Sequence, residues 1–566
     1  MRLLKPAVLL SLLGLLAPSQ GCAGTATKAS QKTVSLRIIE TTDVHGHFFS
    51  KDLTTGKEVP GGISRAKPYV DSLRSVYGDR LLLVDNGDIL QGLPLNYYSN
   101  YLQTDEPNIS ARIVNYMDYD VQNIGNHDIE AGHQVFDKWI AETKCPVLGA
   151  NIIDSITGKT YVAPYHLFQR DGVKIAVLGL VTHSIPFWVN HSAWQAMGFL
   201  PIVEQTRQWV EWLKEGEHAD LIVGLFHSGW NGGITLGDEQ EDAVEQMARE
   251  IGGLDVILYG HDHRQRTEWI ANDSTGHDIL CINPSCNAMN IADVSIEMVY
   301  EDGRLTEKHI DGSIVDISQK AADTAMEQHF KSFTSAVSKY MKQKVGKCDS
   351  TVCMENVFFG PSALIDFIHD IQLRHTGADI SLTAPLYDHA VLNKGTIRMS
   401  DLFDLYRYEN KLVVMTLTGE EIRNHLEMSY DLWANTMTSP RDHALRLRPA
   451  GKTSDEPQKA SEGNWEFANM TFNFDSAAGI VYEVDLRKPD GEKVHILKTC
   501  DGEPFCEDKT YKVALNSYRA NGGGELLTKG AGLSQEDIKE RIVFRSEENI
   551  RSFIEDEFRQ KGTIHP

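Results

Sequence analysis

The stretch DVILYGHDHRQ, residues 255–265, sets a short apolar run directly before a turn that carries two histidines. The run Val256 to Tyr259 is only four residues long and is followed by glycine, which predicts a buried strand that ends there. His261 and His263 come immediately after it. One such pair is weak evidence, because two solvated loop histidines explain it equally well. A stronger inference needs matching groups at the ends of other strands.

Other predicted strands of the same half of the chain also end on polar side chains. The runs IIETTDVHGH, LLLVDNGD, VQNIGNH and LIVGLFH carry at their ends Asp43 and His45, Asp88, Asn126 and His127, and His227. In open α/β sheets, ligand sites gather at the carboxyl ends of strands. We therefore expect all these groups to face one crevice.

The alternation of strands and helices predicts two α/β domains. Between Val34 and about Tyr300, the apolar runs alternate with amphipathic helical stretches at 203–216 and 241–253, which favours a layered domain with mixed sheets over residues 34–315. Residues 316–345 are polar and helix-prone and predict one linker helix. A second α/β domain is expected over 346–561.

Length and charge limit the classes of partner. A chain of 566 residues is too long for one core and fits two or three domains. A formal net charge of −24 argues against a nucleic-acid polymer or an anionic membrane surface as the main partner, because either would be repelled. A small anionic substrate fits if the protein holds cations locally. No protein partner is implied.

The first 21 residues read as an export signal. Arg2 and Lys5 precede the apolar run 7–17, which is too short to span a bilayer, and PSQGCAG follows. This pattern resembles a bacterial lipoprotein signal, in which Cys22 becomes the lipidated first residue. The alternative is plain cleavage and a soluble periplasmic product. We expect an exported protein of the periplasm or cell envelope, attached to the outer membrane only through a lipid on Cys22.

The remaining seven cysteines include three closely spaced pairs. In an exported protein these pairs are candidates for local disulfides and leave Cys145 over: Cys281 with Cys286, Cys348 with Cys353, and Cys500 with Cys506.

The types of donor at the strand ends indicate a metal site. Two carboxylates, one amide oxygen and four imidazoles suit Zn, Mn, Co or Fe(II), whereas calcium prefers six to eight oxygens. Seven donors are too many for one tetrahedral ion and are natural for two ions that share a carboxylate. Two metal ions about 3.5 to 4 Å apart support in-line displacement at phosphorus.

Five sequence blocks carry a family resemblance. In order, DVHGH (43–47), DNGDILQG (85–92), GNHD (125–128), HSG (227–229) and GHDH (260–263) resemble the blocks of the metallophosphoesterases. The resemblance implies a four-layer α/β/β/α sandwich with two divalent metal ions. It assigns the first ion to Asp43, His45, Asp88 and His263, and the second to Asp88, Asn126, His227 and His261.

The same resemblance implies the catalytic roles. A hydroxide between the ions is the expected nucleophile, its pKa lowered by the metals. His127 would donate to the phosphoryl or leaving-group oxygen, and the acidic residue three positions on would orient it. That residue is Glu130 here, whereas many relatives have Asp.

The second half of the chain resembles the nucleotide-binding domain of the exported 5'-nucleotidase and 2',3'-cyclic-nucleotide phosphodiesterase group. The stretches LYRYENKLVVMTLTGEEIRNHLEMS (405–429) and ALNSYRANGGGEL (514–526) carry it. It implies that the rings of Tyr408 and Tyr518 stack on the two faces of the base, and that Asn521 and Gly522 contact the substrate. Stacking of this kind contributes about 1 to 3 kcal/mol per base without selecting one base.

Two departures bear on the substrate. SLTAPLYDHAVLNKGTIR (381–398) replaces an NGGGIR-like stretch of typical 5'-nucleotidases, and a ribose-binding aspartate of many relatives falls on Gly524. Both favour a 2',3'-cyclic-nucleotide phosphodiesterase and 3'-nucleotidase. The alternatives are a 5'-nucleotidase, a UDP-sugar hydrolase, a thiosulfohydrolase of the same fold, or a surface lipoprotein that binds nucleosides without catalysis.

Overall fold

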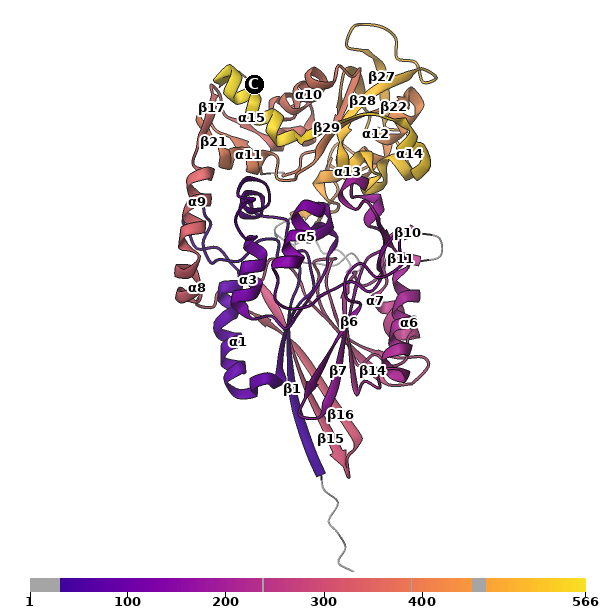
Figure 1. Cartoon of the computed structure of the whole chain (residues 1–566). Helices are drawn as coiled ribbons and strands as arrows, with labels where there is room; N and C mark the ends of the chain where they lie inside the picture. The colour runs from indigo at the N-terminus through magenta and orange to yellow at the C-terminus, as the bar shows by residue number, and fades with distance from the viewer. Residues whose placement is uncertain (1–30, 237–238, 388, 450–464, 566) are drawn as a thin grey trace, which may run out of the picture.

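The computed structural model describes residues 31–236, 239–387, 389–449 and 465–565, which form two α/β domains joined by helices along one side (Figure 1). The expected signal and Cys22 lie outside these residues. Within the described part of the chain, no helix has the length and apolarity needed to cross a membrane.

The N-terminal domain is built on two six-stranded sheets. The first sheet has the order β16 (Arg304–Asp316), β15 (Asn290–Glu301), β1 (Gln31–Thr41), β2 (Leu81–Asp85), β3 (Val121–Asn123) and β4 (Val147–Leu148). The second has the order β13 (Gln265–Ala271), β14 (Asp278–Pro284), β12 (Val256–Tyr259), β9 (Leu221–His227), β7 (Val173–Val181) and β6 (Tyr165–Arg170).

The alternation of side chains along the strands produces the layers. Ile38 and Leu82 point into the apolar core between the two sheets, whereas their neighbours Ile39 and Leu83 pack under the helices. The helices α1 (Ile63–Tyr77), α3 (Ile109–Met117) and α5 (His133–Glu142) lie on the first sheet, and α6 (Ile202–Glu215) and α7 (Val244–Glu250) on the second (Figure 1). The predicted four-layer sandwich is confirmed.

Parallel pairing brings the strand ends to one edge of each sheet. β1 pairs in parallel with β2, and β2 with β3; in the other sheet β9 pairs in parallel with both β7 and β12. β1 enters at the far end of the molecule and runs toward the second domain (Figure 1). The carboxyl ends of these strands therefore face the boundary between the domains.

The segment expected to form one linker helix contains two. α8 (Thr324–His329) begins after Asp323, whose side chain accepts a hydrogen bond from the Met326 N–H, and α9 (Lys331–Met341) follows. The chain bends at Phe330, which has a non-helical backbone (φ −91°, ψ 6°) and a buried ring 5.8 Å from that of Phe49. Burial of this ring against the N-terminal domain interrupts the helix.

The C-terminal domain centres on a five-stranded sheet. Its order is β25 (Ser476–Ala478), β19 (Ile380–Thr383), β28 (Thr510–Asn516), β22 (Lys411–Thr418) and β29 (Ile542–Asn549). The main helices of this domain are α10 (Ala363–Thr376), α12 (Gly419–Trp433), α14 (Gln535–Arg541) and α15 (Ile550–Lys561). A short helix, α13 (Ser517–Ala520), directly follows β28 at the boundary with the N-terminal domain (Figure 1).

The expected local disulfides do not form among the described residues, where all seven cysteines are free. Cys281 lies in β14 with its side chain buried in the core beneath α6 and α7. Cys286, in contrast, is close enough to His263 for its thiol to hydrogen-bond that ring. Spacing in sequence did not reveal that the two side chains belong to different surroundings.

Candidate active site

The predicted donors stand on tightly turned backbone at the strand ends. Asp43, His45 and Asp88 have φ values of 49°, 48° and 58°, and His261 and His263 have 75° and 58°. Non-glycine residues rarely adopt this left-handed conformation, although Asp and His do so more readily than most. Five such residues at one edge of the sandwich indicate a site for which the fold tolerates local strain.

Backbone hydrogen bonds fasten neighbouring loops to each other. The Asp43 N–H donates to the Gly87 carbonyl (3.0 Å), and the His45 N–H donates to the Asp88 carbonyl (2.9 Å). At Gly260, a Cβ atom would lie 2.4 Å from Asp43 Oδ2. Only glycine allows the His261 loop to approach this closely.

Asp128 organises the site, although sequence reasoning assigned it no role. Its buried carboxylate accepts four backbone N–H bonds of 2.8 to 2.9 Å. The donors are the N–H groups of Asp88, Ile89, Leu90 and Gly125. Asp128 thus ties the loop after β2 to the loop after β3, and its place as the last letter of GNHD was the only sequence signal.

The first group of donors surrounds Asp43 Oδ1. This oxygen lies 3.3 Å from His263 Nε2 and 4.0 Å from His45 Nε2, and the two histidine nitrogens are 3.1 Å apart. Asp43 Oδ1 is buried and has no hydrogen-bond partner among the described residues. A buried carboxylate oxygen without a donor, close to imidazole nitrogens, fits a bound cation.

The second group surrounds His227. Its Nε2 lies 3.2 Å from Asp88 Oδ2, 3.1 Å from Asn126 Oδ1 and 3.9 Å from Asp43 Oδ1. Asp88 Oδ2 is also 3.9 Å from His45 Nε2, so this oxygen is shared between the two groups. We call the seven residues Asp43, His45, Asp88, Asn126, His227, His261 and His263 the donor cluster; six of them meet through the atoms named above.

His261 is held differently. Its Nε2 lies 2.7 Å from Glu241 Oε1, on β11 (Glu239–Asp242), while its ring centroid is 5.3 Å from that of His227. Because the Glu241 contact occupies Nε2, Nδ1 is the ring atom left for a metal ion. Sequence reasoning missed Glu241, which lies in a stretch predicted only as helical.

His127 and Glu130 form a close pair beside the donor cluster. Both belong to α4 (Asn126–Glu130), where spacing of three residues puts them on one face, and His127 Nδ1 is 2.6 Å from Glu130 Oε2. The His127 ring lies 5.4 Å from that of His45. Burial alone would lower the pKa of His127, but the Asp88 and Glu130 carboxylates outweigh it and raise the pKa to about 9.

The two predicted base-stacking tyrosines lie on the C-terminal domain, close enough to the N-terminal domain for its carboxylates to affect their pKa values. Burial raises the pKa of Tyr518 to about 12, and Glu241 and Tyr408 add to the shift. Burial also raises the pKa of Tyr408, with a further contribution from Glu130.

The turn after α13 supports Tyr518. A Cβ atom on Gly523 would lie 2.4 Å from the Tyr518 ring, so glycine is needed for this packing. Asn521 donates from Nδ2 to the Trp188 carbonyl (2.9 Å) and so contacts the other domain, while Gly522 has a φ of 99°. Neither residue is placed against a base by these contacts.

Arg519, the residue after Tyr518, belongs to a buried ion cluster with Asp475 and His425. Its Nε and Nη2 donate to the Asp475 carboxylate (2.8 and 3.2 Å), and His425 Nε2 lies 2.8 Å from the same carboxylate. Burial would raise the pKa of Asp475, but the Arg519 charge and the His425 hydrogen bond hold it at about 2. The Arg519 guanidinium also sits 5.5 Å from the Tyr518 ring centroid.

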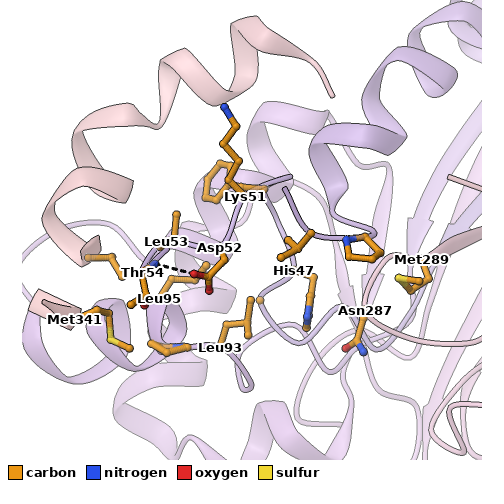
Figure 2. Close-up of a pocket in the computed structure, with 16 residues that line it drawn as sticks. His47, Lys51, Asp52, Leu53, Thr54, Leu93, Leu95, Asn287, Met289 and Met341 are labelled. Carbon is orange, nitrogen blue, oxygen red and sulfur yellow. Dashed lines mark hydrogen bonds between the residues drawn. The ribbon is translucent and has the colours of Figure 1, made fainter. Parts of the chain in front are cut away.

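A separate pocket of about 300 Å³ adjoins the His45 loop (Figure 2). Leu53, Leu93 and Met289 give it a mostly apolar wall, and Met341 of α9 closes one side. None of the donor cluster lines it. The metal chemistry therefore belongs to the strand ends and not to this pocket.

Two families match the two halves of the chain. The calcineurin-like phosphoesterase family matches residues 36–265, and the 5'-nucleotidase C-terminal domain matches residues 342–529. A 2',3'-cyclic-nucleotide 2'-phosphodiesterase/3'-nucleotidase of Salmonella typhimurium is 26% identical over 96% of this chain and 89% of its own. A 5'-nucleotidase of Vibrio cholerae is 32% identical over 42% of this chain and 43% of its own.

Solved structures agree in fold. A putative 5'-nucleotidase from Staphylococcus aureus superposes with a TM-score of 0.75 at 22% identity, covering 92% of this chain and 96% of its own. A 5'-nucleotidase precursor from Thermus thermophilus gives 0.63 at 20% identity, covering 94% and 97%. The chain thus belongs to the metallophosphoesterases that carry a 5'-nucleotidase C-terminal domain, a family of metal-dependent phosphoester hydrolases.

Proposed function

We propose that this protein hydrolyses 2',3'-cyclic nucleotides and nucleoside 3'-phosphates. The observation that carries this proposal is the donor cluster at the domain boundary, in a chain whose relatives over 96% of its length include enzymes named for these two activities. Tyr408 and Tyr518 of the C-terminal domain support it as candidates for base stacking. The departures at 381–398 and Gly524 support the same choice.

The contacts support a role for each residue. The seven residues of the donor cluster would hold two divalent ions, which supply Lewis acidity and lower the pKa of a bound water. His127, oriented by Glu130 through the 2.6 Å contact, would give its proton to the leaving oxygen. Tyr408 and Tyr518 would stack on the base and bring the phosphate to the metals, with Asn521 and Gly522 beside them.

The experiment is a substrate panel with metal replacement. Purified protein is depleted with a chelator, reloaded separately with Zn, Mn, Co and Fe(II), and assayed on 2',3'-cyclic AMP, 3'-AMP, 5'-AMP and a UDP-sugar. We expect activity on the first two that disappears on chelation. Full activity after complete metal removal would overturn the metal mechanism, and bound nucleoside without turnover would favour a non-catalytic binding protein.

A 5'-nucleotidase is the second candidate. It is favoured by the Vibrio cholerae relative, which is 32% identical but over only 42% of the chain. Faster release of phosphate from 5'-AMP than from 3'-AMP would select it.

We also propose domain limits of 34–315 and 346–561, and export to the periplasm or cell envelope. The basic residues and apolar run of the first 21 residues support export, and Cys22 is the proposed lipid attachment site. Radiolabelled palmitate incorporated into the wild type but not into Cys22→Ala would demonstrate the lipid.

A further inference from the structure

A pocket of about 410 Å³ lies between the domains, apart from the donor cluster. The N-terminal domain contributes residues 186–194, and the C-terminal domain contributes α13, α14 and β29. Figure 1 shows α13 and α14 at the boundary of the two domains. No residue of the donor cluster lines this pocket.

Arg545 of β29 brings an uncompensated positive charge to the pocket. Its Nη2 donates to Asn521 Oδ1 (3.3 Å), whereas its Nη1 is buried and has no hydrogen-bond partner among the described residues. Burial lowers the pKa of Arg545, but a guanidinium remains a cation at any ordinary pH. Arg545 is partly buried, and a partly desolvated cation without a counter-charge is stabilised when an anion binds beside it.

The rest of the lining agrees with this charge. None of the lining residues is acidic, although the chain as a whole carries a net charge of −24. Lys539 of α14 adds a second cation, and Gln535 and Asn521 add amide groups. The pocket therefore offers hydrogen-bond donors and positive charge to a ligand, which is the environment that an oxyanion requires.

The pocket is connected to the active site through Asn521. The same side chain that accepts from Arg545 donates to the Trp188 carbonyl, and the Trp188 ring lies 5.9 Å from that of the candidate metal ligand His261. Since both domains line the pocket, a ligand there would contact both sides of the boundary that separates the tyrosines from the metals.

We propose that this pocket binds a phosphate group, with Arg545 as its principal ligand. The group is either free inorganic phosphate or a second phosphate carried by the substrate. Binding of free phosphate needs no turnover, so it can be tested independently of the proposed activity.

The test compares the holoenzyme with Arg545→Gln. Binding of inorganic phosphate is measured by isothermal titration calorimetry, and binding at the metals is followed separately by competitive inhibition of hydrolysis. For wild type we expect one phosphate more than the metal centre takes. Loss of a charge-assisted hydrogen-bond donor should weaken binding of that additional phosphate by about tenfold or more and leave the inhibition constant unchanged.

A second measurement identifies the source of the phosphate. If the substrate carries it, Arg545→Gln raises KM for adenosine 3',5'-bisphosphate and not for 3'-AMP. If the phosphate is free, only the calorimetric site changes. Equal phosphate stoichiometry and affinity in both proteins, together with an unchanged KM ratio, would overturn the proposal.

Three further variants serve as controls. Lys539→Gln changes an exposed side chain and so should not disturb the fold. It should weaken binding of the same phosphate severalfold. Arg545→Lys keeps the charge and should retain part of the binding. Arg487→Gln removes an exposed, Asp485-paired arginine of the same domain outside the pocket and should change nothing.

Discussion

The two domains bury charge in opposite ways. In the ion cluster of the C-terminal domain, Asp475 is matched by Arg519 and His425, and every charge has its partner inside the protein. In the donor cluster, carboxylates and imidazoles crowd together and Asp43 Oδ1 lacks a donor among the described residues. The first arrangement pairs its charges within the protein, which favours stability, whereas the second leaves a carboxylate oxygen that a bound cation would satisfy.

The largest expected effect is at the edge of the donor cluster. His127→Ala should lower kcat by about 10²- to 10⁴-fold because it removes the proton donor. Metal content, measured by plasma emission spectrometry, should stay near that of the wild type. Loss of a metal ion from this variant would instead identify His127 as a metal ligand and not as the catalytic acid.

A substitution in the ion cluster should lower the stability of the protein and leave its metal content unchanged. Asp475→Ala leaves the buried Arg519 charge without its partner, so we expect the free energy of unfolding of the C-terminal domain to fall by about 3 to 5 kcal/mol. Urea unfolding followed by circular dichroism measures it. Asp485→Ala, which breaks an exposed pair with Arg487, is the control and should leave the free energy of unfolding almost unchanged. Equal losses in both variants would contradict the comparison.

A Glu241 variant tests whether a residue outside the donor cluster affects metal binding. Glu241→Gln weakens the contact that leaves Nδ1 of His261 for the metal, and we expect affinity for one of the two ions to fall by about 10- to 100-fold. Titration of the metal-free protein measures both sites. Glu245→Gln, on α7 and paired with Arg249, is the matched control. Unchanged affinity at both sites would show that Glu241 does not influence metal binding.

The smallest expected effect is on substrate binding next to the ion cluster. Tyr518→Ala removes about 1 kcal/mol or more of base stacking, so KM for 3'-AMP should rise about fivefold or more. KM for an aryl phosphate, which has no base to stack in this way, should hardly change. A similar rise for both substrates would remove Tyr518 from the base site.

The sequence predicts the sandwich and the positions of its donors because both depend on local pattern. β12 and β9 are short apolar runs that end on His261 and His227, and parallel pairing brings such ends together. The contact between Glu241 and His261 depends instead on the hairpin of β10 (Gly232–Leu236) and β11, which folds back over the strand ends. No periodicity in the sequence reports a contact of that kind.

The same distinction explains the other differences. The bend at Phe330 accompanies burial of its ring against the N-terminal domain. The helical pattern of residues 316–345 gives no sign of that contact. Cys281 and Cys286 are close in sequence, but the strand directs the first into the core. The partners of Asp128 are backbone groups and leave no trace in residue type.

The left-handed backbone at five positions of the donor cluster has an evolutionary consequence. A residue held in this conformation raises the energy of the fold by about 1 to 3 kcal/mol, and glycine would relieve it. Replacing Asp43 or His261 with glycine would relieve this strain but remove a donor from the cluster. Selection for stability alone would therefore tend to erode the donor cluster.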